Sequence, residues 1–153
     1  MLICVIDGRG GGLGSRLILR LRGVLDDTHE ILAMGTNTVA AAAMTKAGAK
    51  HVVVGECAIR HALHEADLIL GSLSIVLSGA MLGQITPAIA CAILLAPCPK
   101  LLLPLNRVGV EVIGVASPTL DPLIGQMIQR VGSILRSPVS PEASSSEISL
   151  QRT

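Results

Sequence analysis

Residues 1–14 read MLICVIDGRGGGLG, an apolar run followed by five glycines within seven positions. The apolar run predicts a strand over residues 2–6, and leucines at 13, 17 and 21 recur at helical spacing, which predicts a helix over residues 13–23. Glycine loses the most conformational freedom on folding, so a cluster this dense indicates special backbone dihedrals or a molecule lying against the chain. A strand, a glycine turn and a helix in this order are typical of nucleotide-binding folds.

The same alternation of strand and helix patterns continues along the chain. It predicts strands at 30–34, 51–54, 68–70, 100–105 and 110–115, and helices over 38–47, 56–65, 87–95 and 120–135. Residues 106–109 are too few for a parallel crossover, so the last two strands are expected to form a hairpin. The predicted fold is α/β: a three-layer, Rossmann-like, doubly wound and mainly parallel sheet with a C-terminal antiparallel hairpin at its edge.

Length and composition narrow the organisation of the chain. The 153 residues predict a Rossmann-like nucleotide-binding domain over 1–136, followed over 137–153 by a flexible Ser/Pro-rich tail that lacks the apolar groups needed to form a core. Half of the residues are hydrophobic and only 15% are charged, which predicts that some apolar surface is covered in a homo-oligomer.

Charge and hydropathy exclude several kinds of partner. A net charge of +1 and the absence of Phe, Tyr and Trp argue against nucleic acid. The uncharged stretch 68–99 is interrupted by Gly, Ser, Gln, Thr and Pro, so we expect core elements there and no membrane span. The N-terminus has no basic segment before its apolar run, and the four cysteines form no C-x-x-C pair, so a cytoplasmic location is expected.

The spacing of the glycines decides which phosphate-binding loop they resemble. Neither G-x-G-x-x-G nor the Walker pattern fits, whereas Gly8, Gly12 and Gly14 give G-x-x-x-G-x-G, which looks like the loop that opens short-chain dehydrogenases. Backbone N–H groups of such a loop and the following helix hold a pyrophosphate, and the end of the second strand approaches the ribose. The predicted ligand is a nucleotide or other phosphate-bearing small molecule, with NAD or NADP as first candidates. The predicted binding residues are Gly8, Arg9, Gly10, Gly11, Gly12, Leu13, Gly14, Gly35, Thr36 and Asn37.

The dehydrogenase resemblance does not extend to catalysis. Short-chain dehydrogenases act through a Tyr, and this chain has none. The acid that usually accepts from the ribose of NAD is replaced by Thr36 and Asn37, which permits NADP. For an enzymatic role the candidates are three polar residues expected at strand ends, namely Asp7, Glu56 and Arg107.

Other interpretations stay open at this stage. The glycines could serve close packing of helix on sheet alone, Asp7 could form a turn, and Glu56 could be a first-turn helix acid. A non-catalytic, homo-oligomeric sensor or assembly module is the main alternative function. A third is a metal-binding protein that uses Cys57, His61 and His64, because i, i+4, i+7 spacing would place them on one helix face.

Five segments together resemble a family of small, functionally uncharacterised bacterial proteins with a Rossmann-like fold. These segments are VIDGRGGGLG, AMGTNTVAAAAMTKAGA, GECAI, AMLGQITPAIA and LLLPLNRVGVEVIGV. The resemblance extends to about residue 136. It implies the fold and a pocket at the glycine loop, and it assigns no catalytic residue.

Overall fold

A five-stranded parallel sheet forms the centre of the computed structural model, which describes residues 1–105, 109–115 and 119–137. The strands are β1 (Leu2–Asp7), β2 (Glu30–Gly35), β3 (His51–Val54), β4 (Leu68–Ser72) and β5 (Lys100–Leu103). Their order across the sheet is β3-β2-β1-β4-β5, and every neighbouring pair is parallel. This matches the first five strands of the 3-2-1-4-5-6 order of Rossmann folds.

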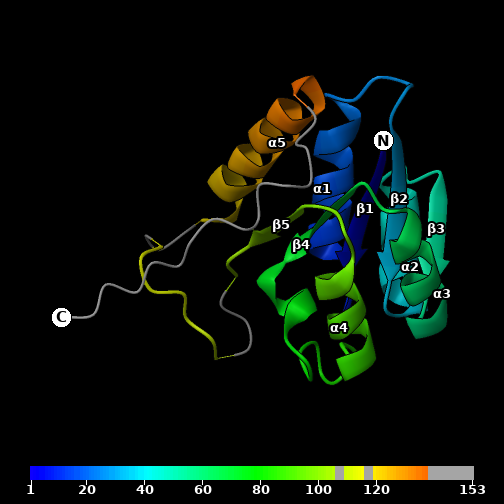
Figure 1. Cartoon of the computed structure of the whole chain (residues 1–153), viewed down its shortest axis with the longest axis vertical. Coiled ribbons are helices and arrows are strands. Elements are labelled where there is room, and N and C mark those ends of the chain that lie inside the picture. Colours follow the sequence, from blue (N-terminus) through cyan, green and yellow to red (C-terminus); the bar gives the residue numbers. More distant parts are fainter. Residues whose placement is uncertain (106–108, 116–118, 138–153) are drawn as a thin grey trace.

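Helices cover both faces of the sheet (Figure 1). One face carries α1 (Gly12–Arg22), α2 (Thr38–Lys46) and α5 (Leu120–Arg136), and the other carries α3 (Glu56–Ala62) and α4 (Pro87–Leu95). Successive β1 side chains alternate between these layers, with Ile3 and Val5 in the first core and Cys4 and Ile6 in the second. The three-layer, doubly wound arrangement is therefore confirmed for the described residues.

The strand order reverses between β1 and β4. The chain moves outward from β1 through β2 to β3, then returns to place β4 on the other side of β1. The connections that leave the carboxyl ends of β1 and β4 consequently run to opposite faces of the sheet. In open α/β sheets this switch point is where ligands bind.

The C-terminal antiparallel hairpin is wrong. Strand β5 lies parallel to β4, and residues 110–115 have no regular secondary structure. Gly109 and Gly114 adopt left-handed dihedrals with φ of 70° and 92°, which interrupt the extended backbone that the alternating valines predict. The centre of the predicted turn, 106–108, lies outside the described residues, as does nearly all of the predicted tail.

Two other predictions about the helices can be compared directly. The predicted start of α4 is confirmed, because Pro87 occupies the first turn and Thr86 Oγ1 accepts a hydrogen bond from Ile89 N at 3.1 Å. Within the part of the chain that the structure describes, none of the helices has the length and apolar character needed to cross a membrane.

The buried thiol of Cys4 makes the free energy of unfolding depend on pH in the alkaline range. Burial in β1 raises its pKa from 9.0 to about 12, with smaller effects from Cys98 and Asp67. The thiol ionises at a lower pH in the unfolded chain than in the folded one. Its contribution to the free energy of unfolding is therefore fully present below pH 9 and is lost as the pH rises toward 12. We expect the free energy of unfolding, followed by far-UV circular dichroism in urea, to fall over this range more steeply in the wild type than in Cys4→Ala. Equal slopes would contradict this assignment.

Candidate functional site

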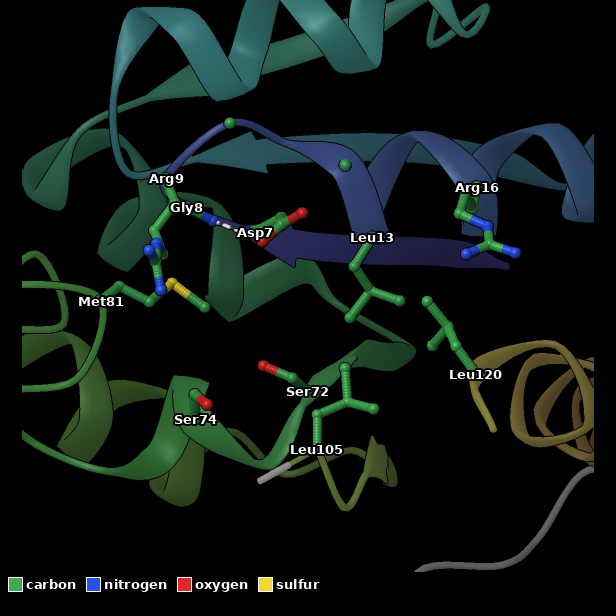
Figure 2. Close-up of a pocket in the computed structure, with 12 residues that line it drawn as sticks. Asp7, Gly8, Arg9, Leu13, Arg16, Ser72, Ser74, Met81, Leu105 and Leu120 are labelled. Carbon is green, nitrogen blue, oxygen red and sulfur yellow. Dashed lines mark hydrogen bonds between the residues drawn. The ribbon is translucent and has the colours of Figure 1, made fainter. Parts of the chain in front are cut away.

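A cavity of about 270 Å³ opens at the switch point, between the carboxyl ends of β1 and β4 (Figure 2). The glycine loop forms one side, and apolar side chains of Leu13, Met81, Leu105 and Leu120 form much of the remaining wall. Polar groups converge on this space from separate elements. Among the described residues, the cavity is lined by Asp7, Gly8, Arg9, Gly10, Gly12, Leu13, Arg16, Ser72, Ser74, Met81, Leu105 and Leu120.

Asp7, the last residue of β1, fastens both ends of the glycine loop. Its carboxylate is buried, with Oδ1 accepting from Gly8 N at 2.7 Å and Oδ2 accepting from Gly14 N at 2.8 Å. Gly14 lies in the first turn of α1, where the helix dipole favours a negative charge. The carboxylate therefore supplies an acceptor that the helix end would otherwise lack, and it also lines the cavity.

The loop glycines fall into two groups according to what a Cβ atom would meet. At Gly8, Gly11 and Gly14 it would come within 2.6 Å of another atom, such as Met81 Sδ, Ala40 O or Met44 Sδ. At Gly10 and Gly12 it would meet nothing within 4 Å. Close packing thus explains the first group and leaves the second unexplained.

Three backbone N–H groups of the loop have no protein acceptor within the described part of the chain. They belong to Gly10, Gly12 and Leu13, all of which line the cavity. The first N–H groups of a helix have no partner inside the helix, and together with the helix dipole they favour an anion. The N–H groups that the sequence predicts for phosphate binding are therefore only partly available. The N–H of Gly14 is bonded to Asp7, whereas those of Gly10, Gly12 and Leu13 can bind an anion.

Arginines from the loop and from α1 also border the cavity. Arg16 pairs with Asp121 of α5, whereas Arg9 forms no ion pair with any described residue. Arg9 has φ of 53°, a left-handed conformation that is uncommon for a residue with a side chain. Such backbone strain is concentrated at functional sites. Arg9, a cation within the loop, thus has an unfavourable backbone conformation.

Ser72 and Ser74 line the cavity at the end of β4. They are only 5% and 3% exposed, yet neither hydroxyl makes a hydrogen bond to a described residue. No fully buried side-chain oxygen or nitrogen of the described residues lacks a hydrogen-bond partner, so these two hydroxyl oxygens are accessible from the cavity and can bond a molecule bound there. In Figure 2 both side chains point into the cavity. The sequence offered one signal for them: Ser72 ends an otherwise apolar strand, and Ser74 follows it in the 3₁₀ turn Leu73–Val76.

Gly35, Thr36 and Asn37, the predicted residues at the end of β2, lie outside the cavity lining. Thr36 and Asn37 are hydrogen-bonded to Gln84. The Oε1 atom of Gln84 accepts from Thr36 Oγ1 at 2.6 Å and from Asn37 Nδ2 at 2.7 Å. Asn37 Oδ1 caps α2 by accepting from Ala40 N at 2.8 Å. Gly35 packs against α2, where a Cβ would lie 2.8 Å from Ala41 N. Thr36 and Asn37 therefore serve contacts within the protein, and nothing in the sequence pattern singled out Gln84.

The other two catalytic candidates do not join Asp7 in the described structure. Glu56 begins α3 and ties it to α4, because Oε2 accepts from Thr86 Oγ1 at 2.6 Å. Its other oxygen lies 3.6 Å from Arg60 Nη1. Glu56 therefore acts as the first-turn acid of the structural interpretation, and Arg107 lies outside the described residues.

The metal site built from Cys57, His61 and His64 is not supported. Helix α3 ends at Ala62 and His64 belongs to a 3₁₀ turn, Leu63–Glu65, so the α-helical spacing that would align the three side chains is broken. All three residues border a groove between α3 and α4. Among the described residues, no cluster of three His, Cys, Asp or Glu side chains is arranged to hold a metal ion.

Comparison with known proteins identifies one family match. The family profile described as "Domain of unknown function (DUF3842)" matches residues 2–136, nearly all of the predicted domain. A search of curated proteins found no match.

Two solved structures match this chain at low sequence identity. A probable oxidoreductase from Mycobacterium abscessus is 19% identical with a TM-score of 0.46, and the match covers 88% of this chain and 39% of that one. A dodecameric FMN-dependent Ubix-like decarboxylase from Escherichia coli O157:H7 is 14% identical with a TM-score of 0.47, and the match covers 88% and 94% of the two chains. The chain thus spans only 39% of the oxidoreductase's length, and at these identities the likeness concerns the fold alone.

Proposed function

The chain belongs to the DUF3842 family of domains of unknown function, and we propose from its site that it binds a nucleotide or another small phosphate-bearing molecule at the switch point. The observation that carries this proposal is the set of three N–H groups, at Gly10, Gly12 and Leu13, that have no acceptor among the described residues and belong to the cavity lining. A phosphate provides the acceptors that they lack. Arg9 supplies positive charge beside them.

The rest of the cavity fits the non-phosphate part of such a ligand. Ser72 and Ser74 offer hydroxyls that are accessible from the cavity, and the carboxylate of Asp7 lines the same space. Leu13, Leu105 and other apolar side chains provide surface for a base or another apolar group. In this proposal Asp7 is also the first candidate for a proton acceptor, should the bound molecule react.

Because there is open space around Gly10 and Gly12, substitutions at these two residues can test ligand binding without disturbing the packing of the protein. We expect the double variant Gly10→Ala/Gly12→Ala to keep its free energy of unfolding within about 0.5 kcal/mol of the wild type, because the added methyl groups clash with no protein atom. Its affinity for AMP, measured by isothermal titration calorimetry, should fall at least tenfold because the methyl groups obstruct approach of the phosphate. Arg9→Gln should also lose about tenfold or more, through loss of a charge-assisted bond, whereas Arg20→Gln at the far end of α1 should bind normally.

The absence of nucleotide binding would favour an assembly module over a ligand-binding protein. If the wild type binds none of AMP, ATP, FMN, NAD or NADP, and phosphate itself gives no thermal shift, the proposal is overturned. The second candidate, a homo-oligomeric assembly module, would then be favoured, because Leu94 and Leu95 on α4 are 59% and 77% exposed. The chain has no Trp, Tyr or Phe, so a nucleotide that copurifies would dominate absorbance at 260 nm.

A further inference from the structure

We infer that Gln84 restricts the site to a ligand of the size of a single nucleotide and excludes the adenosine half of a dinucleotide. This inference rests on the proposed function and narrows its ligand class. In Rossmann sites that bind NAD, the adenosine ribose lies at the carboxyl end of the second strand, beside the glycine loop. Here that position is held by a side chain of the protein.

Gln84 occupies the polar groups that a ribose would use. Its Oε1 atom accepts from Thr36 Oγ1 and Asn37 Nδ2, at 2.6 Å and 2.7 Å. Arg9 N lies 3.4 Å from the same oxygen, and Asn37 Nδ2 also donates to Arg9 O at 3.2 Å. The side chain thus bridges the end of β2 and the glycine loop, the two elements between which a dinucleotide has to lie.

Gly8 shows how tightly this bridge closes over the loop. A Cβ atom there would be 2.5 Å from Met81 Sδ, 2.6 Å from Thr36 Oγ1 and 3.3 Å from Gln84 Oε1. No ligand group can enter between these atoms and the Gly8 backbone unless Gln84 and Met81 move. Figure 2 shows Met81 beside Arg9 at this edge of the cavity.

The loop that carries Gln84 is built to hold it there. Met81 and Leu82 both adopt left-handed dihedrals, with φ of 55° and 59°. Two consecutive non-glycine residues in that region are unfavourable and persist only where surrounding contacts fix them. Such contacts include hydrogen bonds from Gly79 N to Ile85 O at 2.8 Å and from Gln84 N to Met81 O at 3.2 Å. Gln84 is therefore a positioned side chain on a closed loop.

The volume and direction of the cavity agree with a smaller ligand. At about 270 Å³ it is below the usual range of roughly 300–1,000 Å³ for sites that enclose drug-sized molecules. It extends from the glycine loop toward β4 and the start of α5, and its lining includes neither Thr36 nor Asn37. This volume favours a nucleoside monophosphate or a sugar phosphate, whereas an extended dinucleotide requires the region beyond Gln84.

Calorimetric titration with AMP and NAD tests the inference. We expect the wild type to bind AMP at least tenfold more tightly than NAD, and Gln84→Ala to raise NAD affinity at least tenfold while AMP affinity changes less than threefold. Gln126→Ala, an exposed glutamine on α5, is the matched control and should change neither. Gln84→Ser is a second truncation that keeps a polar group on the loop, and far-UV circular dichroism checks the fold of each variant.

Each other outcome has a definite meaning. If AMP binds but NAD binds the wild type equally well, or if neither Gln84 variant changes the preference, the inference is overturned and the proposed function stands. If neither nucleotide binds any folded variant, the inference is overturned, and the proposed function is overturned with it when ATP, FMN, NADP and phosphate also fail to bind the wild type.

Discussion

Asp7→Ala should lower the free energy of unfolding by about 2–6 kcal/mol, because each of two buried N–H groups left without its charged acceptor costs about 1–3 kcal/mol. The two groups are Gly8 N and Gly14 N, at 2.7 Å and 2.8 Å from the carboxylate oxygens. Urea unfolding followed by far-UV circular dichroism measures this, since the chain has no aromatic fluorophore.

Two controls separate the loop contacts of Asp7 from the loss of a negative charge. Asp7→Asn keeps one acceptor oxygen and should lose less stability than the alanine variant. Asp27→Ala removes an exposed carboxylate from the same chain and should change stability by no more than about 0.5 kcal/mol. A loss below 1 kcal/mol in Asp7→Ala would mean that the carboxylate does not hold the loop.

Gly11→Ala should lower the free energy of unfolding by about 2–5 kcal/mol, through two additive causes. Gly11 has φ of 70°, a left-handed conformation that costs about 1–2 kcal/mol for any residue with a Cβ. That Cβ would also lie 2.6 Å from Ala40 O of α2, a clash with backbone that overpacking data put at about 1–3 kcal/mol.

The matched control for Gly11→Ala is Gly10→Ala, one residue away. Gly10 has no left-handed φ and open space around its Cβ position, so its variant should retain wild-type stability. Urea midpoints of the two proteins, measured side by side, make the comparison. Similar midpoints would show that the loop relaxes around Gly11 and that its contact with α2 is not required.

The sequence predicted most of the sheet because strand and helix periods alternate without ambiguity. Leu13, Leu17 and Leu21 mark α1, and their spacing predicts the helix directly. The small alanines of α2 allow the close approach that the structure shows between Gly11 and Ala40. The hairpin failed for a different reason. Alternating valines indicate an extended backbone, but whether a partner strand exists depends on tertiary context that no local pattern contains.

The sequence predicted the part of the candidate site that is formed by the backbone after the first strand. It did not predict the side chains that reach the site from distant parts of the sequence. Gly10, Gly12 and Asp7 follow the first strand directly, so their place at the switch point follows from the fold. Gln84 is 48 residues from Thr36, and Leu120 reaches the cavity from the last helix. Such contacts depend on how loops fold over the sheet, which spacing within one segment does not encode.

The carboxylate that joins Gly8 to Gly14 has a consequence for kinetics as well as stability. Because both ends of the loop are already hydrogen-bonded to Asp7, the loop loses little backbone entropy when a ligand binds. Binding should then resemble rigid-body docking. Differences in affinity among related ligands should therefore appear mainly in their dissociation rate constants.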